Sequence, residues 1–312
     1  MRITILGAES LGVRGLSCVV KVKERRIVID PGLALGYRRH GLLPHPAQVA
    51  VGEQVRRRIL AALKDATDVV ISHFHGDHIP LPNANPYQLK AQEAAPLSRA
   101  ARFWAKGPQA LSHSMVRRRE SLCHVLGRDL PNAEGKKDGA LGFSPPVPHG
   151  EPGSRLGTVM MTRIEGEGTV FVHASDIQLL DGEAVSLILA WRPDIALVGG
   201  PPLYLPWLPS KLRKVAWEHA QRLARNVDTL ILDHHLLRCE KGLSWLDHLS
   251  SETGRRVICA ADFMGRPRSL FEARREQLYE EMPVPEGWHE AYACGDADTH
   301  CYGDYVSMKG VA

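Results

Sequence analysis

Residues 72–78 of the chain read Ser-His-Phe-His-Gly-Asp-His and directly follow the short apolar run Asp68–Ile71. That run has the length and β-branched composition of a buried strand, so the polar segment is expected to form a turn at the end of the strand. Its three histidines and one aspartate are ligand types that suit zinc, manganese or iron(II). The alternative is a polar loop whose histidines merely cap the strand, but ordinary loops seldom concentrate such groups so densely. The segment therefore predicts a metal site.

The composition is that of a globular protein large enough to bury a substantial core. The chain has 312 residues, of which 44% are hydrophobic, and a formal net charge of +4. Its apolar runs are far shorter than a membrane span, and residues 1–7 read as a first strand and not as a signal peptide. We therefore expect a cytoplasmic protein without membrane contact. The mild positive charge would help an anionic substrate to approach, but it is below that of dedicated nucleic-acid binders.

Strand and helix patterns alternate along the chain. Hairpins are expected early in each half, at residues 17–30 and 157–173, and strands then alternate with helices. This rhythm predicts an α/β protein in which two mixed sheets pack between helices. Residues 32–51, rich in Gly, Pro and basic residues, are expected to form a surface loop before a helix over residues 54–64. No linker divides the chain, so we expect a single domain over residues 1–312.

Residues 79–139 interrupt this alternation of strands and helices. They contain several prolines, followed by helical patterns around Leu97–Trp104 and His113–Leu126. We interpret the segment as a largely helical insertion, which leaves the ligand turn and returns just before His149 and so covers the site. Three consecutive arginines of its second helix are candidate contacts for an anionic substrate, with a solvated helix face as the alternative. They are Arg117, Arg118 and Arg119.

Further ligand-type residues follow the other apolar runs. They are Asp30, His149, Asp176 and the adjacent pair His234 and His235. Loops at strand ends are places where a rigid scaffold can gather residues that are distant in sequence. In their order along the chain these motifs resemble the metallo-β-lactamase superfamily. Its His-x-His-x-Asp-His signature is met by residues 73–78, and its later His, Asp and His correspond to His149, Asp176 and His234.

The resemblance covers residues 1 to about 240 and implies an αββα sandwich, in which two mixed β-sheets are flanked by helices. Within the superfamily, the chain looks like a mostly archaeal group of predicted metal-dependent hydrolases. The segments that carry this narrower similarity are residues 9–18, 148–150 and 233–238.

The family pattern implies two divalent ions. The residues that would hold the first ion are His73, His75 and His149. The residues that would hold the second are Asp77, His78 and His234, with Asp176 as a bridge between the ions. Zn²⁺ is the expected metal, and Fe²⁺ and Mn²⁺ are alternatives. The implied reaction is hydrolysis, in which a metal-bridged hydroxide attacks an ester, lactone, thioester or phosphodiester, with Asp77 as the catalytic aspartate.

Three residues are candidates for hydrogen-bond support of these ligands: Asp30, Asp233 and Ser175. We expect His234 and not His235 to be the last ligand, because successive side chains of an extended segment point in different directions. In that geometry Asp233 and His235 both face away from His234. A bend at Asp233 would reverse the choice.

Two other functions are compatible with this pattern. One is an iron-dependent redox enzyme, because histidine and carboxylate ligands do not discriminate between zinc and iron(II). The other is a protein that binds or processes nucleic acid through residues 117–119, although a complete ligand set argues against lost catalysis. The six cysteines form no Cys-x-x-Cys pair, so the chain lacks the rubredoxin-like module of diiron relatives. The expected partner is a small-molecule or anionic substrate, and the sequence leaves its identity and the oligomeric state open.

Overall fold

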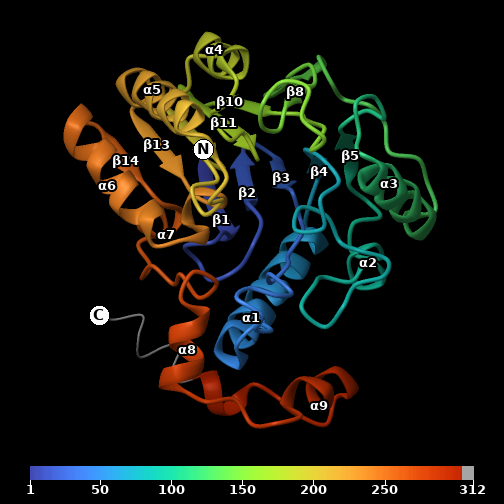
Figure 1. Cartoon of the computed structure of the whole chain (residues 1–312). Coiled ribbons are helices and arrows are strands. Elements are labelled where there is room, and N and C mark those ends of the chain that lie inside the picture. The colour runs from blue at the N-terminus through green and yellow to red at the C-terminus, as the bar shows by residue number, and fades with distance from the viewer. Residues whose placement is uncertain (304–312) are drawn as a thin grey trace.

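Two mixed β-sheets form the centre of the computed structural model, which describes residues 1–303 (Figure 1). The first sheet has the strand order β1-β2-β3-β4-β5, in which β1 to β3 are antiparallel and β3 to β5 parallel. Its strands are β1 (Arg2–Gly7), β2 (Ser17–Val22), β3 (Arg25–Ile29), β4 (Asp68–Ile71) and β5 (Arg102–Ala105). The hairpin predicted over residues 17–30 is confirmed, because β2 and β3 pair in antiparallel orientation there.

The second sheet has the order β14-β13-β12-β11-β10-β7-β6, with β11 to β14 parallel and the other neighbouring pairs antiparallel. Its strands are β6 (Lys137–Asp138), β7 (Leu141–Phe143), β10 (Thr162–Gly166), β11 (Thr169–Ser175), β12 (Ile195–Val198), β13 (Thr229–Leu232) and β14 (Arg256–Ile258). A separate small ribbon pairs β8 (Val147–Pro148) with β9 (Thr158–Val159). Because parallel strands of one sheet end at the same edge, the residues after β11 and β13 lie at one edge of this sheet.

Alternate residues of the first sheet pack into two different cores. Ile27 and Ile29 of β3 belong to the core shared with the second sheet, whereas Val28 between them belongs to the core under helix α1 (Pro46–Lys64). Side chains of a strand alternate between its faces, so a sheet that is apolar on both faces must be covered on both. The second sheet and α1 provide these two covers, and the predicted α/β sandwich is confirmed.

Helices cover the outer faces of both sheets. Figure 1 shows α5 and α6 beside β13 and β14, with α1 and α2 on the far side of the sandwich. The remaining helices are α2 (Ala91–Ala94), α3 (His113–Leu126), α4 (Gly182–Ala190), α5 (Ser210–Asn226), η1 (Leu236–Arg238), α6 (Lys241–Thr253), α7 (Ala260–Phe263), α8 (Arg275–Glu281) and α9 (Trp288–Cys294). In residues 1–303 no helix combines the length and the apolar character needed to cross a membrane.

The start of α1 differs from the sequence prediction. The helix begins at Pro46 and not near residue 54, and the imidazole of His45 accepts a hydrogen bond from the Ala47 N–H at its first turn. Proline suits the first helical position because its missing N–H would have no helical partner there. Much of the predicted surface loop, residues 32–51, is therefore buried helix and buried chain. The composition of this stretch is misleading because most of its glycines and prolines are buried, namely Gly32, Gly36, Pro44 and Pro46.

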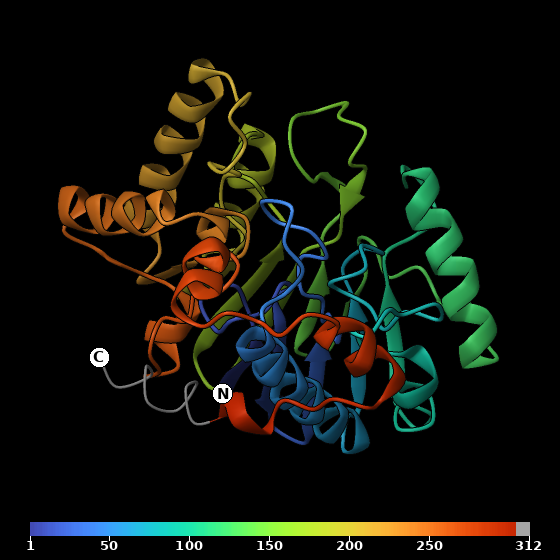
Figure 2. The same ribbon diagram turned by 60° about the horizontal axis from the view of Figure 1, so that its bottom comes forward.

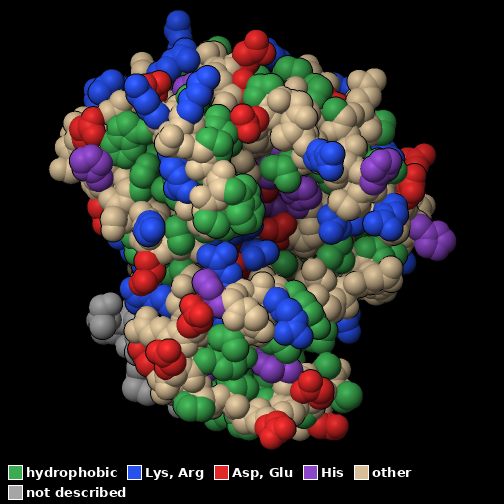
Figure 3. All heavy atoms as spheres, viewed as in Figure 1, with side chains coloured by type: hydrophobic (Ala, Val, Ile, Leu, Met, Phe, Trp, Pro, Cys, Tyr) green, Lys and Arg blue, Asp and Glu red, His purple; other side chains and the backbone are tan. Residues whose placement is uncertain are grey.

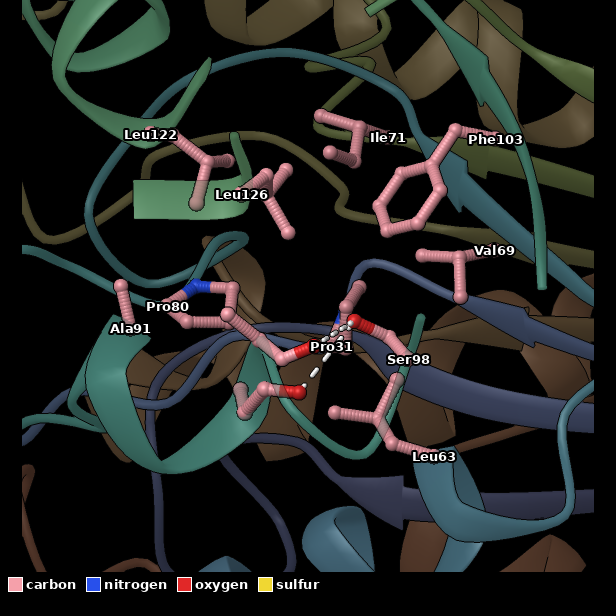
Figure 4. A pocket seen from close by; sticks show the side chains of 12 residues that line it. Pro31, Leu63, Val69, Ile71, Pro80, Ala91, Ser98, Phe103, Leu122 and Leu126 are labelled. Atoms are coloured by element: carbon pink, nitrogen blue, oxygen red, sulfur yellow. Dashed lines mark hydrogen bonds between the residues drawn. The ribbon is translucent and has the colours of Figure 1, made fainter. Parts of the chain in front are cut away.

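Residues 79–139 contain helices α2 and α3, but they also supply strand β5. The helix predicted around Leu97–Trp104 is wrong over its last residues, because Arg102–Ala105 pairs in parallel with β4. Figure 4 shows Phe103, Leu122 and Leu126 pointing with Val69 and Ile71 into a small apolar cavity of about 20 Å³ between this segment and the sheet. The segment is thus joined to the sheet by an apolar contact as well as by strand pairing.

The C-terminal portion packs over α1. Figure 2 shows α8 and α9 running across the outside of that helix. Leu278 and Trp288 belong to the same apolar core as the inward face of α1, and Tyr292 donates a hydrogen bond to Glu53. The portion of the chain that carried no sequence motif therefore has a structural role.

Candidate metal centre

The carboxylate of Asp176 lies at the centre of a buried cluster of histidines. Its Oδ2 faces His149 Nε2 at 2.9 Å and His73 Nε2 at 3.3 Å, while its Oδ1 faces His78 Nε2 at 2.9 Å. His75 Nδ1 lies 3.9 Å from Oδ2. The seven residues that the resemblance implies as ligands are therefore brought together, although they come from four separate segments.

Four groups of possible ligand atoms occur in residues 1–303, and within each group all the atoms lie within 4.8 Å of one another. Two of these groups, Asp30 with His73 and His78 and Asp176 with His234 and His235, share members with the two positions described next. The first position is the group His73, His75, His149 and Asp176. The second position is the group Asp77, His78 and His234. These are the groupings that the resemblance implies for two ions.

The hydrogen-bonding pattern of the cluster fits a cation. His73 Nε2, His78 Nε2 and Asp176 Oδ1 are buried and have no hydrogen-bond partner within the described part of the chain, residues 1–303. Buried polar atoms are nearly always paired, because an unpaired one loses its interactions with water without compensation. A divalent ion bound between these facing atoms would accept their lone pairs and so compensate for the missing hydrogen bonds.

Strand ends place these residues, and the backbone there is unusual. Asp30 follows β3, Ser175 ends β11 and His234 lies just after β13, and all three have positive φ (47°, 51° and 53°). This conformation is unfavourable by about 1 kcal/mol or more for a residue with a Cβ. The surrounding packing must compensate for it, which is typical of functional sites.

Asp30 forms a hydrogen bond with His78, one of the predicted ligands. Its Oδ2 accepts a hydrogen bond from His78 Nδ1 at 2.9 Å and another from Ser175 Oγ at 3.0 Å, and its Oδ1 accepts one from the Ser72 N–H. Burial would raise the pKa of Asp30, but the hydrogen bond and the charge of His78 outweigh it and lower the pKa to about 2. Asp30 and Ser175 therefore hold the ligand turn in place, and the Asp30 bond orients the His78 ring.

Asp233 does not support a ligand side chain, contrary to prediction. Its carboxylate accepts hydrogen bonds from the Ser10 N–H and hydroxyl, the Ala260 N–H and the His234 N–H. All of these but one come from segments distant in the sequence, so Asp233 joins three loops behind the site. Its contact with the site is through the His234 backbone alone.

The chain does not stay extended at the histidine pair. Because His234 has a left-handed backbone, both rings turn toward Asp176: His234 Nε2 lies 3.4 Å from Oδ1, and His235 Nε2 lies 3.4 Å from Oδ2. The expectation that His235 faces away from His234 is wrong, because the centroids of the two rings lie 4.5 Å apart. Both ring nitrogens of His235 are buried and have no hydrogen-bond partner. Which of the two histidines binds an ion stays a prediction.

The histidines of the cluster differ in their pKa values. Burial lowers the pKa of His73 to about 3 and that of His234 to about 4, and it also lowers the pKa of His149. His78 is the exception. Burial lowers its pKa too, but the adjacent carboxylates Asp176 and Asp30 outweigh burial and raise it well above the usual value. Neutral imidazole, the form that binds metal, is thus favoured at most of these rings.

The sequence analysis missed Arg238 and Glu9. Arg238 Nε donates to Glu9 Oε1 at 2.9 Å, and Arg238 Nη2 lies 3.3 Å from Asp77 Oδ2. Both side chains are buried. In the sequence, both residues lie in segments that resemble the archaeal group, which is the only local signal for them. A buried charged pair whose members are 229 positions apart produces no periodic pattern in the sequence.

The three arginines of α3 have different surroundings. Arg119 donates to the Leu130 carbonyl, and Arg118 to the carbonyl of Phe74 in the ligand turn at 3.5 Å. Arg117 is exposed, and it lines with Arg118 a groove of about 370 Å³ that also includes Gln88. The structure therefore brings Arg118 to the ligand turn but directs Arg119 away from it.

The cluster opens to one face of the molecule. Figure 3 shows a hollow near the middle of this face, with histidine and acidic side chains inside it and basic side chains along one border. The side chains of His75 and Asp77 are 21% and 15% exposed, whereas those of His73, His78 and His234 are fully buried. A small molecule could therefore reach the ligand turn from this side.

Comparison with known proteins agrees with this architecture. Residues 12–79 match the model of the metallo-β-lactamase superfamily. The chain is 53% identical over 302 residues to a UPF0282 protein of Methanosarcina mazei, covering 97% of this chain and 99% of that protein. It is 35% identical to a UPF0282 protein of Pyrococcus furiosus, covering 92% and 96% of the two chains.

A solved structure is similar in fold. Tm1679, described as a metal-dependent hydrolase of the β-lactamase superfamily, superposes with a TM-score of 0.51 at 14% identity, covering 83% of this chain and 96% of that one. This likeness concerns the fold alone. Together with the ordered ligand motifs and the sequence identity to archaeal relatives, it shows that the chain belongs to the UPF0282 family of the metallo-β-lactamase superfamily.

Proposed function

We propose that this protein is a metal-dependent hydrolase that acts on an ester, lactone, thioester or phosphodiester. The observation that carries the proposal is the fully buried Asp176, whose two carboxylate oxygens each face a different set of imidazoles with unpaired nitrogens. A carboxylate in that position can bridge two cations. No structural role explains so many unpaired ligand atoms in the interior.

His73, His75, His149 and Asp176 would hold one ion, and Asp77, His78 and His234 would hold the other with the second oxygen of Asp176. Ions bound there would acidify a water molecule and so supply a nucleophile near neutral pH. We propose Zn²⁺ as the metal, since it suits a set of imidazoles and carboxylates, with Fe²⁺ or Mn²⁺ as alternatives.

The chain's own residues would orient the ligands and the substrate. The Ser72 hydroxyl lies 2.9 Å from His73 Nδ1, and Asp30 accepts from His78 Nδ1, so the opposite nitrogen of each ring faces Asp176. His235 Nε2 lies 3.4 Å from Asp176 Oδ2 and, among residues 1–303, has no hydrogen-bond partner. It is therefore able to form a hydrogen bond to an oxygen of the substrate.

Two grooves next to the site would contact the substrate. One, of about 710 Å³, begins at Pro148, the residue before His149, and is lined by Ser112, His113 and Arg155. The other contains Arg117 and Arg118. Basic side chains in both favour a small anionic substrate over a neutral one.

The test is hydrolysis by the metal-loaded protein. Zn²⁺-loaded and chelator-treated protein should be compared on representative phosphodiesters, lactones, thioesters and β-lactams. We expect one class to be hydrolysed only by the loaded protein, and Asp176→Asn to reduce that turnover by roughly a thousandfold or more, since it weakens both positions at once. Asp228→Asn, an exposed change at the start of β13, is the matched control and should leave turnover unchanged. Equal turnover with and without metal would exclude the proposal.

A further inference from the structure

Arg238 places a fixed positive charge at one of the two candidate metal positions. Its Nη2 lies 2.8 Å from His234 Nε2 and 3.3 Å from Asp77 Oδ2, so one guanidinium nitrogen contacts two of the three residues of the second position. A guanidinium stays protonated at all physiological pH values. The nitrogen that would bind the second ion is therefore already facing a cation.

The side chain of Arg238 is held in this place. It is 7% exposed, and its Nε donates to Glu9 Oε1 at 2.9 Å while Nη1 reaches the Tyr204 hydroxyl at 3.3 Å. Glu9 is itself buried. Moving Arg238 away would leave a buried carboxylate without its partner, which is strongly unfavourable.

The other nitrogen of His234 is also unsuited to metal binding. The Gly15 N–H points at His234 Nδ1 at 3.2 Å, so N–H donors face both ring nitrogens. A neutral imidazole has one acceptor nitrogen and one N–H, so it can accept only one of these bonds. Binding an ion through Nε2 puts the proton on Nδ1, where it would meet the Gly15 N–H. Metal-bound histidines usually donate from the second nitrogen to an acceptor, whereas Glu9 Oε1 lies 3.9 Å from His234 Nδ1, beyond hydrogen-bond distance.

The first position has neither feature. In residues 1–303, no lysine or arginine forms an ion pair or hydrogen bond with His73, His75, His149 or Asp176. His73 has the Ser72 hydroxyl at Nδ1, which can accept its proton and leave Nε2 free for an ion. The two positions thus share Asp176 and similar ligands, but only one is free of a competing charge.

We propose that Arg238 makes the two positions unequal, so that the protein binds one divalent ion tightly at His73, His75, His149 and Asp176 and a second at least a hundredfold more weakly. The physical cause is repulsion between two cations a few ångströms apart in a poorly solvated site, together with competition for Asp77 and His234. This inference rests on the proposed function, since it assumes that the cluster holds metal.

The first experiment is a calorimetric titration of the metal-free wild-type protein with Zn²⁺, with native mass spectrometry to count the ions bound. We expect a first ion and then a second whose dissociation constant is at least a hundredfold larger. Two ions with dissociation constants within tenfold of each other would overturn the inference alone. A folded protein that binds no ion would overturn the proposed function and this inference with it.

The second experiment removes the charge. The variant Glu9→Gln with Arg238→Gln deletes both members of the buried pair, so that Glu9 is not left as a buried carboxylate without its partner. We expect its two dissociation constants to lie within tenfold of each other. Glu9→Gln alone keeps the guanidinium and should keep the wild-type difference.

The direction in which the second dissociation constant changes in the double variant shows whether Arg238 competes with the second ion or only orients its ligands. If Arg238 only oriented Asp77 and His234, the double variant would lose the second ion instead of gaining affinity for it, and that result would overturn the inference. Circular dichroism of each variant checks that it is folded. If the double variant does not fold, the wild-type titration still tests whether the two positions are unequal, and equal affinities would overturn the inference.

Discussion

The two halves of the metal cluster have similar ligands but different neighbours. His73 and His149 face Asp176 Oδ2 with no cation bonded to them, whereas Asp77 and His234 face the guanidinium of Arg238. Imidazole and carboxylate are equally good ligands on both sides. What differs is the set of hydrogen-bond partners and charges behind the ligands. A ligand motif therefore identifies a metal site but does not determine how strongly each part of it binds.

Loss of a ligand from the first position should have the largest effect. We expect His149→Ala to weaken binding of the first ion by roughly a hundredfold or more, since loss of a ligand's hydrogen-bond partner alone typically weakens binding by roughly 10–100-fold. Elemental analysis and a Zn²⁺ titration measure this. An unchanged first dissociation constant would show that the two halves are wrongly ranked.

Loss of a ligand from the second position should have a smaller effect on the first, tightly bound ion. We expect Asp77→Ala to abolish binding of the second ion and hydrolysis, but to change the first dissociation constant by less than about threefold, because Asp77 contacts only the second position. The fold should be kept, since the side chain lies at a partly exposed turn. Native mass spectrometry and circular dichroism check both points. Unfolding of this variant would mean that the turn is structural.

The two positions should also respond differently to pH. The raised pKa of His78, caused by Asp176 and Asp30 against the effect of burial, means that the metal-free protein holds a proton there at pH 7. Binding at the second position must displace that proton, so affinity there should rise with pH, by up to about tenfold per unit between pH 6 and 8.

At the first position burial lowers the pKa of His73 to about 3 and also lowers the pKa of His149, so these two rings do not hold a proton that the ion must displace in the way His78 does. The first dissociation constant should therefore change less with pH than the second over the same range. Equilibrium dialysis with Zn²⁺ at pH 6, 7 and 8 tests this. Parallel pH dependence of the two ions would contradict the assignment of the proton to His78.

The smallest effect is expected for α3. Arg119→Ala removes the hydrogen bond to the Leu130 carbonyl and should lower the free energy of unfolding by about 1 kcal/mol, without changing the difference between the two metal positions. Urea unfolding and a Zn²⁺ titration measure the two quantities. Arg117→Ala, at an exposed position, is the control and should change neither. A changed difference in metal affinity would mean that α3 contributes to the cluster.

Several features were predictable because their signals are local. The buried strand before residues 72–78 shows as a short apolar run, and the ligand motifs follow one another in an order that is typical of the superfamily. The two mixed sheets follow from hairpins succeeded by alternating strands and helices. Asp30 and Ser175 were predicted as supports because each lies beside a strand end, and the structure places both at the cluster.

Only the tertiary structure decided which neighbours these residues have. Strand β5 forms where a helix was predicted, because pairing with β4 outweighs local preference. The left-handed backbone of His234 turns both histidines of the pair inward, which a pattern of extended residues does not predict. Glu9 and Arg238 lie 229 positions apart in the sequence and meet behind Asp77. Burial of such a pair depends on the whole fold, so the sequence determined which residues form the cluster, whereas long-range contacts decided the charge around each half of it.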